Sequence, residues 1–125
     1  MKEEIQCAAH FLSSLLHRGL STREQAERFS NKLQELLSQR FHDHWHPDKP
    51  QRGSGFRCIR INHKLDPLVE EALAYCGLGG PKGNSVLPKE LALWIDPKDV
   101  SYRIGEDGSI CQLQLIYEEF ECLCL

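Results

Sequence analysis

The segment from residue 87 to residue 109, LPKELALWIDPKDVSYRIGEDGS, constrains the fold more than any other part of the chain. In its first half apolar residues recur at every second position, which is typical of a β-strand that buries one face. The side chains predicted to enter the core are those of Leu91, Leu93 and Ile95. Trp94 and Asp96 fall on the opposite face, so the strand displays a tryptophan beside a carboxylate. The alternative is that another part of the chain covers Trp94.

The second half of this segment predicts a β-ribbon. Pro97 ends the first strand because proline has no amide hydrogen to donate to a neighbouring strand. Residues 100–104 resume the strand pattern, and Glu106-Asp107-Gly108 has the composition of a hairpin turn. Residues 109–117 then form the return strand.

The first half of the chain has helical periodicity instead. Apolar residues at helical spacing predict a helix over residues 3–18, ending at Gly19. Ser21-Thr22-Arg23-Glu24 is a capping-box pattern, in which a hydroxyl and a carboxylate satisfy exposed amides at a helix start. This second helix continues to about residue 43, and the short connection predicts a helical hairpin.

Between the hairpin and the ribbon lie one more strand and one more helix. Residues 56–62 alternate, and Ile59 with Ile61 favours burial of the face that also holds Arg57. Asp66 followed by proline predicts a helix start, and that helix ends at Gly77. The order predicts an α+β fold: an N-terminal helical hairpin packed on a small, mainly antiparallel β-sheet with one or two further helices.

Composition excludes several classes of protein. With 125 residues, the chain is long enough for one domain with a single core. A formal net charge of −3 disfavours a domain that binds nucleic-acid phosphates. The N-terminus lacks the pattern of a secretory signal, and no apolar run is long enough to span a membrane, so we expect an intracellular protein. In that compartment the six irregularly spaced cysteines are expected to be free thiols.

The sequence also offers a candidate metal site and a candidate nucleic-acid-binding face. His42, His44 and His46 alternate, and alternating histidines on a strand can bind a transition metal, as a metal-dependent hydrolase requires. Here they span a predicted helix end, which would scatter them, and a polar helix terminus explains them as well. Five cations between Lys49 and Lys64 could contact an RNA or DNA backbone, although a solvated face is the simpler interpretation. No motif for nucleophilic catalysis or phosphate binding is present.

Two long segments resemble the signature boxes of the BTG/Tob antiproliferative family. The first is residues 41–62, which contain HWHPDKPQRGSGFRCIRI at positions 44–61, and the second is residues 87–109. Both occur in the family's order behind a helical hairpin, so the resemblance covers about residues 3–113. It implies a family domain over residues 1–113 followed by a short tail over residues 114–125.

The resemblance implies a non-enzymatic adaptor without a cofactor or metal. Its expected partner is the catalytic subunit of the cytoplasmic poly(A) deadenylase complex, so that the chain promotes mRNA deadenylation and turnover and restrains cell proliferation. Carried over to this sequence, the deadenylase-binding residues are Phe56, Trp94 and Asp96. An alternative role is that of a transcriptional co-regulator acting through DNA-binding factors. We expect a monomer in cytoplasm and nucleus, with no direct contact to nucleic acid or membrane.

The resemblance also implies a contact with poly(A)-binding protein after the second box. The residues are Tyr102, Arg103, Gly105, Glu106, Asp107 and Gly108. Beyond Cys111 the sequence departs from the family's ending. It also departs at Lys98, where the family usually has an aromatic residue, and that change is expected to weaken binding of the deadenylase.

Overall fold

The computed structural model describes residues 1–18, 21–80, 87–116 and 121–124. The helices and strands follow one another in the order α1 (Lys2–Arg18), α2 (Arg23–Phe41), the 3₁₀ turn η1 (Ser54–Phe56), β1 (Cys58–Asn62), α3 (Pro67–Tyr75), β2 (Glu90–Asp96), β3 (Asp99–Ile104), β4 (Cys111–Ile116) and β5 (Glu121–Cys124). The α+β fold predicted from the sequence, with its N-terminal helical hairpin, is confirmed. No helix within the described ranges is long and apolar enough to span a membrane.

The helices begin where hydrogen-bonding side chains can satisfy their first amides. The capping box of α2 is formed by Thr22 and Gln25, each of which binds the backbone of the other. The predicted box of Ser21 and Glu24 is therefore wrong by one residue. Asp66 caps α3 by accepting a hydrogen bond from the Leu68 amide, as predicted.

All five strands lie in one antiparallel sheet in the order β1-β2-β3-β4-β5. In β2, Trp94 is flanked by Cys58 of β1 on one side and Ser101 of β3 on the other. Strand β5, from the predicted tail, pairs with β4 and so extends the sheet. The boundary between domain and tail at residue 113 stays a prediction.

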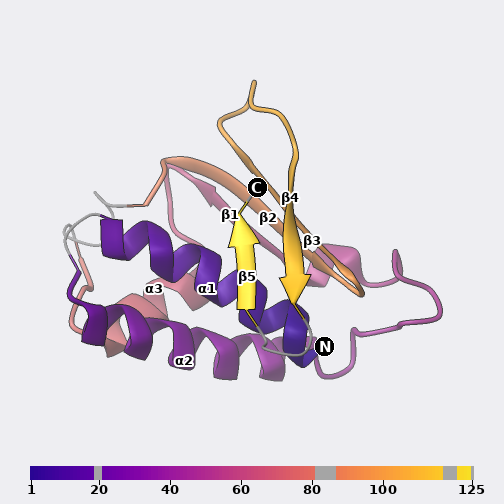
Figure 1. The fold of residues 1–125 in the computed structure, drawn as a ribbon, viewed down its shortest axis with the longest axis horizontal. Helices are drawn as coiled ribbons and strands as arrows, with labels where there is room; N and C mark the ends of the chain where they lie inside the picture. The colour runs from indigo at the N-terminus through magenta and orange to yellow at the C-terminus, as the bar shows by residue number, and fades with distance from the viewer. Residues whose placement is uncertain (19–20, 81–86, 117–120, 125) are drawn as a thin grey trace.

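The core lies between the sheet and the helices, which cover one of its faces (Figure 1). Helix α1 packs against β2, β3, β4 and β5, while α2 packs against α1 and α3. The inward residues of β2 are Leu91, Leu93 and Ile95, all fully or almost fully buried as predicted. The loop between α2 and β1 and the turn between β3 and β4 extend away from this core (Figure 1).

Candidate functional site

Trp94 and Asp96 lie on the face of the sheet opposite the helices. Both are half-buried, while the inward neighbours Leu93 and Ile95 are fully buried. The same face carries exposed or half-buried polar side chains from the neighbouring strands. These are Arg60 of β1, Ser101 and Arg103 of β3, and Gln112 and Gln114 of β4. We call this surface the open face, and it has the mixture of aromatic and polar groups that protein partners contact.

Arg57 joins the loop between α2 and β1 to the end of β2. Its side chain is fully buried, yet each of its five N–H groups has an acceptor. Nε donates to the Ile95 carbonyl at 2.8 Å, and Nη2 donates to Asp96 Oδ1 at 2.8 Å. The other acceptors are the carbonyl oxygens of His44, Pro50 and Arg52.

The loop is shaped to approach this guanidinium. Gly53 has a φ of 76°, and a Cβ there would lie 3.1 Å from the His44 carbonyl oxygen and 3.2 Å from Arg57 Nη1. A side chain at this position would be strained by the backbone angle and would crowd both the His44 carbonyl and the guanidinium, which favours glycine. Trp45 also contacts Arg57: its ring lies 5.4 Å from the guanidinium and stacks on Phe41 of α2. We call Arg57, its five acceptors and Trp45 the Arg57 cluster. Asp96 is thereby an oriented carboxylate with one oxygen held from within.

Of the two aromatic residues predicted to bind the deadenylase, Phe56 is more exposed than Trp94. It ends the 3₁₀ turn η1, its residue is 59% exposed, and η1 contacts β2. Its ring stacks on His44, with centroids 4.0 Å apart and planes 11° from parallel. Because Arg57 follows Phe56 directly and binds Asp96, Phe56 lies near the Asp96 end of β2, and Trp94 lies two residues before Asp96 on the open face.

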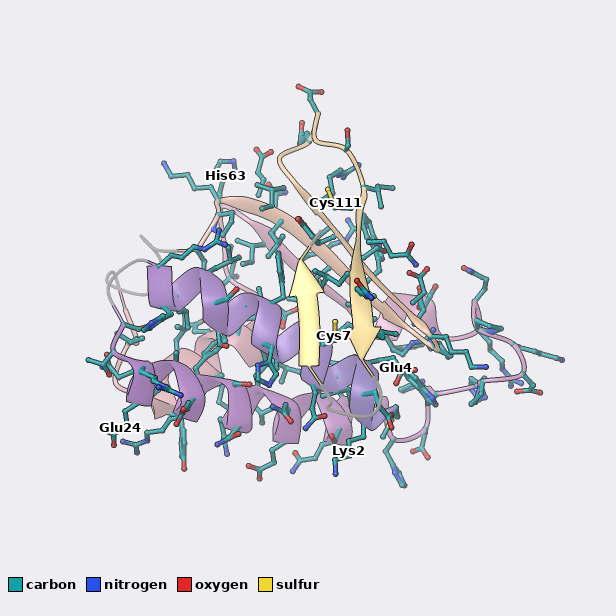
Figure 2. All side chains as sticks on the ribbon, viewed as in Figure 1. Lys2, Glu4, Cys7, Glu24, His63 and Cys111 are labelled. Carbon is teal, nitrogen blue, oxygen red and sulfur yellow. The ribbon has the colours of Figure 1, made fainter. Side chains whose placement is uncertain are left out.

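The turn between β2 and β3 is fixed to helix α1. Pro97 and Lys98 form this two-residue connection, and Lys98 has a left-handed φ of 61°. Its amide donates to the buried carboxylate of Glu4 at 2.9 Å. Glu4 is labelled in Figure 2. The Lys98 side chain is exposed, and the turn that carries it follows Asp96 directly and is hydrogen-bonded to α1.

The residues suggested for a poly(A)-binding-protein contact fall on different surfaces. The ring of Tyr102 lies on the helix-covered face, with its centroid 4.4 Å from that of Phe11. Arg103 lies on the open face, 6.0 Å from the Trp94 ring. Glu106 and Asp107 are exposed in the β3–β4 turn, where a Cβ on Gly108 would collide with the Ile104 carbonyl oxygen.

The alternating histidines do not gather at a common point. His44 stacks on Phe56, whereas His42 is exposed next to Asp43. Among the described residues there is no group of three histidine, cysteine, aspartate or glutamate side chains that could hold a metal ion.

The cysteines differ from the expectation of six free thiols. Cys7 is buried and disulfide-bonded, so the expectation is wrong for this residue (Figure 2). Helix α1 packs along β4 and β5, and such contacts between distant parts of a chain cannot be derived from cysteine spacing. Cys58, Cys76 and Cys111 are free.

The free thiols are expected to react with dithionitrobenzoate at different rates. Burial raises the pKa of the Cys76 thiol, which keeps it protonated and shielded, so it should react only when the chain opens. Cys58 and Cys111 are half-exposed and should react in the folded protein. Peptide mass spectrometry after brief alkylation measures each site separately; early labelling of Cys76 would contradict the burial described here.

Sequence reasoning placed Arg57 on the buried face of a strand over residues 56–62 and assigned it no role; its burial is confirmed, but β1 begins at Cys58 and Arg57 caps the end of the 3₁₀ turn η1. An arginine at an inward position of an alternating strand is itself a signal, because a buried guanidinium needs acceptors for all its N–H groups. The stacking of His44 on Phe56 had no comparable signal in the sequence.

Comparisons with known proteins agree with the fold and the two motifs. The model of the BTG family matches residues 1–114. The chain is 52% identical to BTG2 of Homo sapiens over 120 residues, covering 95% of this chain and 74% of that protein. It is 53% identical to BTG1 of Bos taurus, covering 88% of this chain and 65% of that protein. It is 44% identical to Tob1 of Rattus norvegicus, covering 88% of this chain and 30% of that protein.

Among solved structures, the chain resembles a doubly substituted variant of the BTG/Tob domain of FOG-3 from C. elegans. The TM-score is 0.77 at 21% identity, covering 90% of this chain and 80% of the other. At this identity the likeness supports the fold.

Proposed function

Since this chain belongs to the BTG family, we propose that it is a non-enzymatic adaptor that binds the catalytic subunit of the cytoplasmic poly(A) deadenylase complex. By bringing that enzyme to messenger RNAs, the chain would promote poly(A) shortening and restrain proliferation. The deadenylase supplies the catalytic groups in this proposal, and the chain supplies a binding surface in the cytoplasm and nucleus.

The observation that supports the proposal is the joining of the two family motifs by Arg57. Its hydrogen bonds to Asp96 and to three carbonyls of the preceding loop hold Phe56, Trp94 and Asp96 on one preformed surface. A preformed surface loses little conformational entropy on binding, which favours affinity. Asp96 uses Oδ1 for Arg57, so Oδ2 can accept a hydrogen bond from the partner.

A calorimetric titration of the full chain with purified deadenylase catalytic subunit tests the proposal. We expect a one-to-one complex with a dissociation constant of roughly 1 μM or below, equivalent to about −8 kcal/mol. Tethering the chain to a reporter messenger RNA should then shorten its poly(A) tail. Absence of binding in the titration would reject the deadenylase as the direct partner. The co-regulator role would then be tested with transcription factors on the same face.

Replacing Lys98 with tyrosine is expected to strengthen binding roughly three- to tenfold, or about 0.7–1.4 kcal/mol. Position 98 is exposed beside Asp96, so an aromatic ring there adds apolar contact area to the proposed docking surface. Titration of the same partner measures the change. Lys98→Gly is the matched control: it removes the cation and suits the left-handed φ, but adds no ring. Equal affinities for the two variants would contradict a role for the ring.

A further inference from the structure

Two arginines face each other across Ala92 on the open face. Arg60 of β1 and Arg103 of β3 both lie opposite Ala92 of β2, one on each side. Neither guanidinium forms an ion pair with any carboxylate in the described part of the chain. Two like charges placed across a small residue repel each other, and a shared anion would relieve that repulsion.

A hollow lies between these two side chains. It has a volume of about 120 Å³, and its lining includes Arg60, Ala92 and Arg103 together with Glu90 and Glu106. The small side chain of Ala92 leaves space between the two arginines. Strands β1 and β3 are about 10 Å apart because two strand spacings separate them. Both arginine side chains are long enough to lean over Ala92 and bind one group between them.

Two carboxylates, those of Glu90 and Glu106, line the same hollow, and neither forms an ion pair with Arg60 or Arg103. Glu90 Oε1 lies 3.1 Å from His63 Nε2, and Glu90 Oε2 accepts a hydrogen bond from the Glu106 amide at 3.1 Å. His63 is labelled at this end of the sheet in Figure 2. The Glu106 side chain is exposed in the β3–β4 turn and lines the hollow without an ion pair to either arginine.

We propose that Arg60 and Arg103 form a clamp for one carboxylate side chain of the protein partner that binds at Trp94. Guanidinium groups bind carboxylates with two parallel hydrogen bonds, which gives the contact direction as well as charge. Arg103 lies 6.0 Å from the Trp94 ring, so the clamp is continuous with the proposed docking surface. The inference rests on the proposed function and adds a second, ionic element to it.

A protein carboxylate fits the clamp better than an RNA phosphate. The hollow has room for a single side-chain group, whereas an RNA strand presents a run of phosphates. The chain has a formal net charge of −3, and Asp99 and Glu106 add to the repulsion that a run of phosphates would meet, whereas a single carboxylate brings only one charge to the two arginines.

The test is a set of calorimetric titrations with the purified deadenylase catalytic subunit. Arg60→Ala and Arg103→Ala should each weaken binding by about tenfold, and the double variant by less than the product, because both arginines bind one group. The matched control is Arg23→Ala, which removes the same charge from an exposed site on α2. Thermal melting checks that all variants stay folded.

The outcomes separate the two proposals. If the unmodified chain binds and the clamp variants match Arg23→Ala, the clamp is wrong and the proposed function stands. If the unmodified chain does not bind, the proposed function fails and the clamp fails with it. Fluorescence anisotropy with a labelled oligoadenylate tests RNA as the ligand. Binding that depends on Arg60 and Arg103 would overturn the carboxylate proposal and assign the clamp to a phosphate. A double-mutant cycle against acidic residues of the partner then identifies the carboxylate.

Discussion

Replacing Arg57 with methionine is expected to lower the free energy of unfolding by about 3–5 kcal/mol. The variant leaves Asp96 without its ion pair and leaves four carbonyl oxygens without their donor. A buried polar group that loses its partner still carries the full free-energy cost of having left water. The destabilisation is therefore larger than the net stabilisation that the hydrogen bonds provide. Methionine fills much of the space, so the loss measures hydrogen bonding more than packing.

Urea denaturation followed by circular dichroism measures this change. Arg52→Met is the matched control, because the exposed Arg52 side chain takes no part in the cluster and its carbonyl remains. We expect that control to lie within about 0.5 kcal/mol of the unmodified chain. Arg57→Lys should fall between the two, since an ammonium group cannot reach all five acceptors. Equal stability of Arg57→Met and Arg52→Met would show that the cluster contributes little to the fold.

Replacing Trp94 with alanine is expected to cost at least about 2 kcal/mol of deadenylase binding, a loss of roughly thirtyfold. Trp94 lies near the middle of the open face, between β1 and β3, where a partner would bury it most completely. The ring is half-exposed and the inward core is built from other residues, so the fold should persist.

Calorimetry and circular dichroism on the same sample separate binding from folding. Tyr75→Ala is the control, because Tyr75 is another exposed aromatic residue but lies on α3 against Arg28 and Lys32. Normal binding by Tyr75→Ala and loss of binding by a folded Trp94→Ala would locate the docking surface. An unfolded Trp94→Ala would instead assign the ring to the core.

The sequence was informative where structure depends on neighbouring residues. Alternation placed Leu93 inside and Trp94 outside, and the structure agrees, because the period of a strand is a local property. Local patterns still left choices open. Ser21 and Thr22 are each followed three residues later by Glu24 or Gln25, so either pair could form the capping box.

Contacts between distant residues could not be derived in this way. Arg57 and Asp96 are 39 residues apart, and no pattern in either segment says that they meet. The disulfide of Cys7 and the pairing of β5 with β4 likewise depend on contacts between distant parts of the chain. The inward position of Tyr102 could have been predicted from the sequence, because Tyr102 alternates with Ser101 and Arg103 in β3.

The Arg57 cluster makes the candidate surface a discontinuous epitope. Phe56 comes from one segment and Trp94 with Asp96 from another, and their relative positions depend on hydrogen bonds inside the folded domain. A linear peptide that copied either segment would lack the acceptors or the donor that orient the other. An inhibitor of this surface would therefore have to mimic a folded shape, and an antibody raised against either peptide alone would recognise a different conformation.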